Sequence, residues 1–268
     1  MKQYGLLGQN IAYSLSPIIH QIIFNKNKID ATYEPYDMAP EKADMFLAHT
    51  HCNGLNVTVP YKTAVLKHCK RISKEAMAVG AVNTLTRSDE GWVGDNTDIF
   101  GLEKFYEKNS LSFQNQTVII LGTGGAAKAV NHTLQNKHTQ HVYRVSRNKR
   151  GIGIIGYKEL SRLEKTDILI NAMPIRAENN PKLAAAVLHA IERCHTIIDL
   201  NYASSESLFL RQEKKAGKKF YNGLDMLIYQ ALKSQEIWNG IEITKDLYDD
   251  IFLSLQTILE RKQKAEKK

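Results

Sequence analysis

Thr117-Val-Ile-Ile-Leu121 runs directly into Gly122-Thr123-Gly124-Gly125-Ala126-Ala127, and this stretch decides the fold class of the 268-residue chain. The apolar residues 118–121 predict a buried strand, and the alanine-rich residues 126–135 predict a helix. A strand, a GxGxxA turn and a helix in this order are the context that a dinucleotide-binding unit requires. The glycines allow a tight turn and a close approach of the backbone to pyrophosphate at the helix N-terminus. The alternative is a glycine-rich turn that serves only the packing of the strand against the helix.

The end of the following strand indicates which dinucleotide is bound. An NAD site has an acidic residue there, about 20 residues beyond the glycines, to accept hydrogen bonds from the ribose hydroxyls. The chain instead has Arg144-Val-Ser146-Arg147-Asn148-Lys149-Arg150, which contains no carboxylate. Guanidinium groups bind a 2′-phosphate and a hydroxyl can hydrogen-bond to it, whereas a carboxylate would repel it. NADP is therefore favoured over NAD, and the alternative is a solvated basic turn.

Short apolar runs alternate with helical patterns along most of the chain, which favours α/β sheets covered by helices. The first hundred residues predict strands over 4–7, 32–36, 55–59 and 82–86, and helices over 17–25, 41–48 and 61–68. A helix over 98–108 leads into a second series, with strands over 118–121, 141–145, 168–171, 196–200 and 219–221 and helices over 126–135, 182–191 and 205–214. Two further helices are predicted over 224–238 and 245–261. Because they follow a complete nucleotide-type unit, we expect them to pack back on the first domain and make it discontinuous.

Composition and cysteine usage exclude several classes of protein. Hydrophobic residues make up 43% and charged residues 24% of the chain, which is ordinary for a globular protein and excludes a wholly disordered or fibrous one. No apolar run approaches the roughly 20 residues that a membrane span needs, and Gln9 and Asn10 come too early for a signal-peptide core. The three cysteines, Cys52, Cys69 and Cys194, form no CxxC pair. We therefore expect a reduced, cytoplasmic protein without a disulfide scaffold or a metal site.

The 36 lysines and arginines exceed the 28 acidic residues and give a formal charge of +8. Such an excess fits a plain basic surface, nucleic acid, a membrane surface or small anionic ligands. Residues 260–268 carry part of this positive charge and follow apolar residues at helical spacing, so we expect them to be the solvated end of a helix. A nucleic-acid binder lacks support because no recognised motif interleaves basic with aromatic residues. We expect a small-molecule substrate, no nucleic acid, no membrane, and a monomer or homodimer.

Polar motifs lie at strand-to-helix junctions in the first half of the chain, where ligands collect in open α/β sheets. In Ser14-Leu-Ser16-Pro17, Ser16 and Pro17 suit the N-cap and N1 positions of a helix, and capping alone would explain them. A helix start rich in hydroxyls can also bind a carboxylate. On this motif alone we favour capping.

A lysine and a carboxylate occur in Asn56-Val-Thr58-Val-Pro60-Tyr-Lys62 and in Gly94-Asp-Asn-Thr-Asp98. Pro60 suits the first turn of a helix, so Lys62 is expected near its N-terminus, where a lysine can serve as an acid–base group. Asp98 could pair with Lys62 and orient its ammonium group. The alternatives are a solvent-facing lysine and a helix cap.

Taken together, these motifs resemble the shikimate dehydrogenase family along nearly the whole chain. The matching stretches, in the family's order, are Ser14-Leu-Ser16-Pro17, Asn56-Val-Thr58-Val-Pro60-Tyr-Lys62, Gly80-Ala-Val-Asn83-Thr, Gly94-Asp-Asn-Thr-Asp98-Ile-Phe-Gly101, Gly122-Thr-Gly-Gly-Ala126, Ile170-Asn-Ala172 and Gly223-Leu-Asp-Met-Leu-Ile-Tyr-Gln230-Ala231. Each alone is modest evidence, but their common order makes the match specific. The resemblance implies reversible reduction of 3-dehydroshikimate to shikimate with NADPH, in the chorismate and aromatic amino-acid pathway.

The resemblance also implies a fold and roles for particular residues. A substrate-binding domain with a mixed sheet, residues 1–99 plus 224–268, would face a Rossmann-type NADP-binding domain, residues 100–223, across a cleft. The catalytic acid–base pair would be Lys62 and Asp98. The substrate would be bound by Ser14, Ser16, Thr58, Lys62, Asn83, Asp98, Tyr202 and Gln230. NADP would be bound by Gly122, Thr123, Gly124, Gly125, Ala126, Ser146, Arg147, Asn148, Leu200 and Gly223.

The chain departs from the family pattern mostly in the expected cofactor domain. Ser146-Arg147-Asn148 replaces the usual Asn-Arg-Thr, and Gly151 replaces a basic residue. Two alternatives stay open. One is a quinate/shikimate dehydrogenase of broader substrate or NAD use, which Ser16 and the lack of an acidic residue near 146 argue against. The other is a non-catalytic NADP-binding relative, which the intact Lys62 and Asp98 disfavour.

Overall fold

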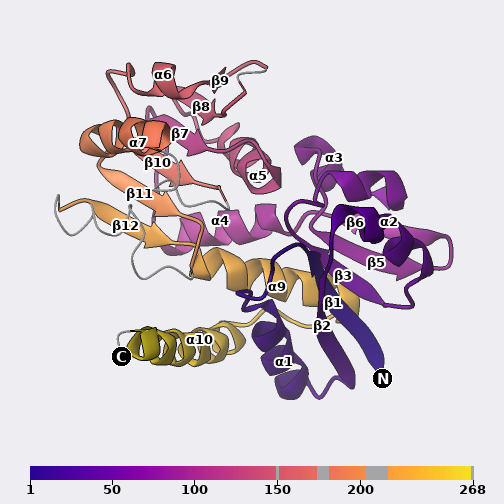
Figure 1. Cartoon of the computed structure of the whole chain (residues 1–268). Helices are drawn as coiled ribbons and strands as arrows, with labels where there is room; N and C mark the ends of the chain where they lie inside the picture. Colours follow the sequence, from indigo (N-terminus) through magenta and orange to yellow (C-terminus); the bar gives the residue numbers. More distant parts are fainter. Residues whose placement is uncertain (149–150, 174–180, 203–216, 267–268) are drawn as a thin grey trace. The chain divides into compact units, whose positions relative to one another are not determined.

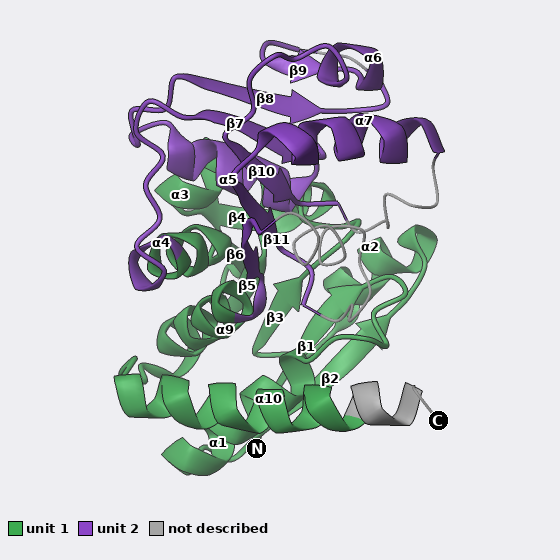
Figure 2. Ribbon diagram, turned by 90° about the vertical axis from the view of Figure 1, so that its left-hand side faces the viewer, with its two compact units in different colours: residues 1–105, 225–268 green, residues 106–224 purple. Residues whose placement is uncertain are grey.

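The computed structural model describes residues 1–148, 151–173, 181–202 and 217–266 of the chain. The chain forms two compact units, shown in different colours in Figure 2. The first unit comprises residues 1–105 and 225–268, and the second comprises residues 106–224. The sequence places the boundaries after residues 99 and 223 instead.

The sheet of the second unit is built from parallel strand pairs only, among the residues described. Its strands are β7 (Thr117–Leu121), β8 (His141–Val145), β9 (Ile154–Ile155), β10 (Ile168–Asn171), β11 (Thr196–Asp199) and β12 (Lys219–Asn222). They lie in the order β12-β11-β10-β7-β8-β9, so the chain starts in the middle, reaches one edge, and then crosses to the other half (Figure 1). Dinucleotide-binding sheets have this strand order, and the prediction of a Rossmann-type α/β unit is confirmed.

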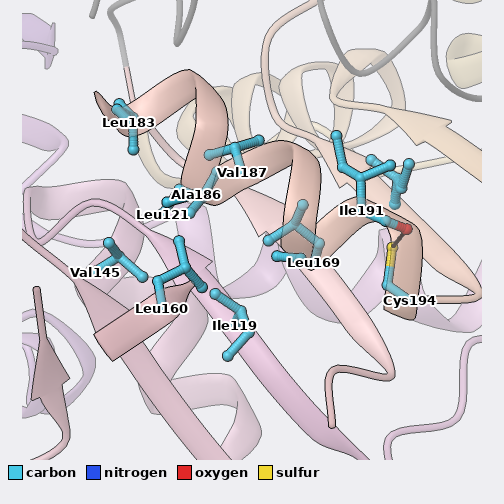
Figure 3. Packing of buried hydrophobic residues seen from close by; sticks show 12 residues of the cluster. Ile119, Leu121, Val145, Leu160, Leu169, Leu183, Ala186, Val187, Ile191 and Cys194 are labelled. Atoms are coloured by element: carbon cyan, nitrogen blue, oxygen red, sulfur yellow. Dashed lines mark hydrogen bonds between the residues drawn. The ribbon is translucent and has the colours of Figure 1, made fainter. Parts of the chain in front are cut away.

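The core of the second unit lies between its sheet and helix α7 (Pro181–Arg193), as Figure 3 shows. Strands β7, β10 and β11 are buried along their whole lengths, as expected for parallel strands with both faces covered. Helix α7 turns an apolar stripe towards them at helical spacing, formed by Leu183, Ala186, Val187, Ala190 and Ile191. Each large aliphatic side chain buried in this way stabilises the fold by about 1.5–3 kcal/mol. The loop that follows β7 is therefore anchored on a well-packed strand.

The sheet of the first unit is mixed. Its strands are β1 (Lys2–Gly8), β2 (Ala31–Asp37), β3 (Gly54–Val57), β4 (Cys69–Ile72), β5 (Thr84–Ser88) and β6 (Gly91–Asp95), in the order β2-β1-β3-β5-β6-β4. Only β5 runs against its neighbours, pairing antiparallel with both β3 and β6 among the described strands. As a result, the carboxyl ends of β1, β3 and β6 and the amino end of β5 meet at one edge of the sheet.

Helices from distant parts of the chain lie in the first unit, with the last turn of α4 and the first residue of α9 belonging to the second unit. They are α1 (Ser16–Asn27), α2 (Pro40–His49), α3 (Lys74–Val79), α4 (Asp98–Lys108), α9 (Leu224–Asn239) and α10 (Lys245–Glu266). Trp238 of α9 stacks on Tyr4, with ring centroids 4.8 Å apart, and donates a hydrogen bond to the Leu85 carbonyl over 3.1 Å. Lys26 of α1 pairs with Asp250 of α10 at 2.6 Å. Within the described part of the chain, no helix has both the length and the apolar character of a membrane span.

The region after β3 differs from its prediction as a helix over 61–68. Residues 59–63 form a turn, and only Ala64–His68 are helical, as the 3-10 helix η1. The Lys62 carbonyl accepts a hydrogen bond from the Val82 N–H over 2.7 Å. This carbonyl therefore bonds to a distant segment of the unit and not to an N–H of a helix that begins at residue 61. The strands β4 and β6 and the helix α3 were not predicted, because they are short and carry no clear periodicity. The helix predicted over 205–214 lies outside the described residues.

His20 of α1 is completely buried in the first unit. Its ring stacks on Tyr33, with centroids 4.0 Å apart, and also lies against Trp238. The side-chain amide of Gln235 donates a hydrogen bond to Nδ1 over 2.7 Å. Burial among these neutral side chains lowers the pKa of His20 to about 3, so the ring stays neutral in the folded protein.

We expect acid to destabilise the first unit through His20. The unfolded chain protonates this histidine near its ordinary pKa of about 6.5, whereas the folded chain does so only near pH 3. The free energy of unfolding therefore falls as the pH drops below about 6.5, by about 3 kcal/mol from this group at about pH 4. Urea unfolding across this window should show a flatter pH dependence for His20→Gln than for the wild type. The matched control is His68→Gln, which removes a half-buried histidine that lies 2.8 Å from Asp44. Equal slopes for His20→Gln and the wild type would contradict the prediction.

Candidate active site

The topology of the first unit gathers predicted site residues at one edge of its sheet. Strands β1, β3 and β6 run in the same direction, and β5 runs against them. The residues brought to this edge are Ser14 and Ser16 after β1, Thr58 and Lys62 after β3, Asn83 before β5, and Asp98 after β6. The edge therefore collects a lysine, a carboxylate, an amide and several hydroxyls from segments far apart in the sequence.

Lys62 and Asp98 form a buried ion pair at this edge. Lys62 Nζ lies 2.6 Å from Asp98 Oδ2, and the two side chains are only 15% and 5% exposed. Asp98 is the first residue of α4, where the positive end of the helix dipole stabilises a negative charge. Its backbone N–H donates to Asn96 Oδ1 over 3.1 Å, which fixes the start of the helix. The predicted pairing of lysine and carboxylate is present.

The second oxygen of Asp98 is held by Asn83. The Asn83 Nδ2 donates to Asp98 Oδ1 over 2.9 Å, so Lys62 and Asn83 occupy different carboxylate oxygens. The Asn83 Oδ1 accepts a hydrogen bond from the backbone N–H of Thr97 over 2.7 Å, and this contact determines which way the amide points. Both oxygens of the carboxylate are thus fixed, while the ammonium group retains N–H donors for a ligand.

The serines after β1 lie at the open start of α1. Ser16 was expected to cap this helix, and that expectation is wrong: Leu15 is the N-cap, and Ser16 is the first helical residue. No side chain caps the helix from the N-cap position, and the Ser14 hydroxyl accepts a hydrogen bond from the Ser16 N–H over 3.2 Å. Two hydroxyls therefore stand beside a helix N-terminus, an arrangement that can bind an anion.

The other predicted substrate residues come from different elements. Thr58 is half-buried in the loop after β3, where its N–H donates to the Leu7 carbonyl over 2.9 Å. Gln230 lies on α9, and its Nε2 donates to the Leu227 carbonyl over 2.8 Å. Tyr202 follows β11 in the second unit and is half-buried.

The glycine-rich turn of the second unit fits a dinucleotide pyrophosphate. Gly122, directly after β7, has φ +109°, a conformation that favours glycine, and a Cβ there would lie 3.2 Å from Met173 Cγ. Gly124 is the N-cap of α5 (Gly125–Leu134), which has no side-chain cap and no acidic residue in its first turn. Thr123 and Ala126 flank this N-terminus and are half-buried. The first N–H groups of α5 are thus available to an anion.

The end of β8 carries the residues predicted to select the cofactor. Arg147 and Asn148 are exposed, and Ser146 is half-buried and accepts a hydrogen bond from the Asn148 N–H over 3.3 Å. Lys149 and Arg150 lie outside the described residues. On the other half of the sheet, Leu200 and Gly223 are neighbours, since a Cβ at Gly223 would overlap the Leu200 carbonyl.

Sequence reasoning missed polar residues that lie behind the ion pair. Thr84, Thr97 and Ser234 are nearly inaccessible to solvent and hydrogen-bond to one another. One signal was present in the sequence, because Ser234 falls on the same helical stripe as the buried residues Ala231 and Trp238. A polar residue in an apolar stripe indicates a buried partner.

Fold and site together define a two-unit α/β protein of the dinucleotide-dependent dehydrogenase class. Residues 6–85 match the model of the shikimate dehydrogenase substrate binding domain. A shikimate dehydrogenase (NADP(+)) from Clostridium perfringens is 33% identical over 268 residues, covering 96% of this chain and 99% of that protein. The structure of shikimate dehydrogenase 1 from Peptoclostridium difficile is 35% identical with a TM-score of 0.87, covering 97% of this chain and 99% of that chain. A chorismate mutase/shikimate 5-dehydrogenase fusion protein from Clostridium acetobutylicum is 37% identical with a TM-score of 0.84 and the same coverages, 97% and 99%. This chain belongs to the shikimate dehydrogenase family.

Proposed function

We propose that this chain is an NADP-dependent shikimate dehydrogenase, which reversibly reduces 3-dehydroshikimate to shikimate. The observation that carries the proposal is the buried Lys62–Asp98 pair, held at 2.6 Å in a chain that aligns with an NADP-dependent relative over nearly its full length. The enzyme is an oxidoreductase that acts on a CH–OH group with NADP as its cofactor. We assign it to the chorismate pathway and to the cytoplasm, with no nucleic-acid or membrane partner, as a monomer or homodimer.

Lys62 is the group that exchanges a proton with the reacting oxygen of the substrate. When held by the glycine-rich turn after β7, NADPH would supply a hydride to the substrate carbonyl, whose oxygen would then carry negative charge. The Lys62 ammonium donates a proton to that oxygen, and in the reverse direction the amine takes the proton up. Asp98 directs the ammonium group, because Asn83 holds its other oxygen and prevents the carboxylate from turning away.

The substrate is held by the polar groups gathered in the first unit. Ser14 and Ser16, beside the N-terminus of α1, bind the carboxylate, since hydroxyls and helix N–H groups both donate to an anion. Tyr202 of the second unit contributes at the carboxylate end. The ring hydroxyls are bound by Thr58, Asn83, Asp98 and Gln230.

The cofactor is held by the second unit, which we assign as the NADP-binding domain, with the first unit as the substrate domain. The backbone of Gly122, Thr123, Gly124, Gly125 and Ala126 surrounds the pyrophosphate. The exposed guanidinium of Arg147, with Ser146 and Asn148, binds the 2′-phosphate, where no acidic side chain opposes it. Leu200 and Gly223 border the nicotinamide.

The activity is tested directly with the purified full-length protein, shikimate and NADP. We expect NADPH to form at a rate proportional to enzyme, with NADP preferred over NAD and shikimate preferred over quinate. The measured quantity is the absorbance of the reduced nicotinamide. Two comparison reactions replace NADP with NAD and shikimate with quinate, one at a time. Faster turnover with NAD or quinate would favour the broader quinate/shikimate activity. No turnover by folded protein would indicate a non-catalytic relative.

Replacement of Lys62 tests its chemical role. Lys62→Ala should lower kcat by about 10²–10⁴-fold, the usual contribution of a positioned proton donor, with little change in the KM for shikimate. Lys67→Ala is the control, because Lys67 is an exposed lysine of η1 paired with Asp44 at 2.5 Å. If Lys62→Ala raised only KM and left kcat intact, Lys62 would have no chemical role.

Replacement of Arg147 tests cofactor selection. A charge-assisted hydrogen bond contributes about 1.5–3 kcal/mol, so Arg147→Ala should raise the KM for NADP by about 10–100-fold. The KM for NAD should stay unchanged, because NAD lacks the 2′-phosphate. Arg144→Ala is the matched control: Arg144 lies in the preceding strand, and its guanidinium donates to the Ile152 carbonyl over 3.2 Å. Equal losses with NADP and NAD would refute a 2′-phosphate contact by Arg147.

A further inference from the structure

Three buried hydroxyls lie together behind the Lys62–Asp98 pair in the first unit. Ser234 Oγ is 3.0 Å from Thr84 Oγ1 and 3.2 Å from Thr97 Oγ1, and the two threonine oxygens are 3.2 Å apart. Ser234 and Thr84 are completely buried, and Thr97 is 2% exposed. Buried polar groups of this kind are stable only when their hydrogen bonds are satisfied. We refer to these three residues as the hydroxyl cluster.

Two amides of known orientation border the hydroxyl cluster. The Asn56 Oδ1 accepts from the Tyr33 hydroxyl over 2.9 Å, so its Nδ2 must face the cluster, where it lies 2.8 Å from Ser234 Oγ. On the other side, the Asn83 Oδ1 accepts from the Thr84 hydroxyl over 3.1 Å as well as from the Thr97 N–H. The cluster therefore accepts hydrogen bonds from both amides, since Asn83 Nδ2 also donates to Thr97 Oγ1 over 2.9 Å, and its Thr84 hydroxyl donates one to Asn83.

Ser234 determines the direction of hydrogen bonding through the cluster. Its hydroxyl donates to the Gln230 carbonyl one turn earlier in α9, over 3.0 Å, and its oxygen accepts from Asn56. With its own proton committed to the Gln230 carbonyl, the Ser234 oxygen accepts a hydrogen bond from the Thr97 hydroxyl over 3.2 Å, and the Thr97 oxygen accepts one from Asn83 Nδ2 over 2.9 Å. The Thr84 hydroxyl packs against Ser234 and keeps its single proton for Asn83 Oδ1. The three hydroxyls are buried at 0–2% exposure, and a buried network loses more than one bond when a member is removed.

The cluster connects α9 to the catalytic carboxylate. A hydrogen-bonded path leads from Ser234 through Thr97 to Asn83 Nδ2, over 3.2 Å and 2.9 Å, and Asn83 contacts Asp98 over 2.9 Å. Asp98 in turn contacts Lys62 over 2.6 Å. Gln230 and Ser234 sit on the same helix one turn apart, so the contact that orients the carboxylate also fixes the helix that carries Gln230.

We propose that Ser234 is a positioning residue for the dehydrogenase reaction. It touches no substrate, cofactor or reacting atom, and it acts by holding Thr84 and Thr97 so that Asn83 keeps Asp98 directed at Lys62. This inference rests on the proposed function, because it concerns the rate of the step in which Lys62 transfers the proton. It adds to that function a role for Ser234 of α9, which is 178 residues away from Asn56 in the sequence.

Two substitutions remove a hydroxyl of the cluster with little change in volume, Ser234→Ala and Thr84→Val. Each should lower kcat for shikimate oxidation by about tenfold, the effect of one hydrogen bond on a barrier, while KM for shikimate and NADP changes less than about twofold. The double variant should lose about as much as either single variant, because both act through one network. Rates are measured per folded protein, well below the thermal midpoint of each variant.

Matched variants separate positioning from stability. Ser254→Ala removes a serine whose hydroxyl makes the same contact with the carbonyl four residues earlier, over 2.8 Å, but in α10 and outside the cluster; its kcat should equal that of the wild type. Thr84→Ser restores a hydroxyl and should recover most of the kcat that Thr84→Val loses.

The outcomes are distinct. An inactive wild type would refute the proposed function itself. With an active wild type, the inference is overturned if Ser234→Ala keeps kcat within about twofold, if Thr84→Ser is as slow as Thr84→Val, or if the two single losses multiply in the double variant. Should Ser234→Ala fail to fold, Thr84→Val and Thr84→Ser decide the question alone.

Discussion

The Asp98 carboxylate is a charge removed from water, and the first unit is arranged around the need to satisfy it. A buried ion is stable only when it is paired and fully hydrogen-bonded, because its desolvation costs several kcal/mol. Lys62 satisfies one oxygen, Asn83 satisfies the other, and the start of α4 adds its dipole. The same contacts that offset the desolvation cost of the carboxylate also hold it in a single orientation. The interactions that stabilise the buried charge are therefore the ones that direct it at Lys62.

The mixed sheet is what makes this arrangement possible. In an all-parallel sheet only the carboxyl ends of strands reach the ligand-binding edge. Because β5 is inserted antiparallel between β3 and β6, its amino end reaches that edge as well, and Asn83 arrives beside Asp98. The second unit has the opposite design. Its described strands pair in parallel only, and the central strands β7, β10 and β11 are fully buried, so the groups open to a ligand are the backbone N–H groups at the start of α5 and the exposed side chains after β8.

Local patterns predicted the elements with strong periodicity and missed those without it. The strand-turn-helix around Gly122 was predicted because apolar runs, glycines and alanines each favour one backbone conformation. The short strands β4 and β6 carry mixed burial and no such signal. Ser16 was interpreted as a cap because Ser-Pro is common at that position, yet the helix begins one residue earlier, with Leu15 as its N-cap. The paired lysine and carboxylate were predicted, but the turn that carries Lys62 was taken for a helix.

The sequence by itself determined the α/β class, the dinucleotide-type turn and the absence of an acidic residue at the end of β8. These features depend on residue type and near-neighbour spacing, which a single sequence displays. The pairing of Lys62 with Asp98, 36 positions apart, was one alternative that the residues left open, and the family resemblance favoured it. Only the tertiary structure decided that Asn83 holds the second carboxylate oxygen and that Thr84, Thr97 and Ser234 form one buried cluster. Hydrogen bonds between residues 13 to 150 positions apart depend on strand direction and helix packing, and these are set by burial of the whole core.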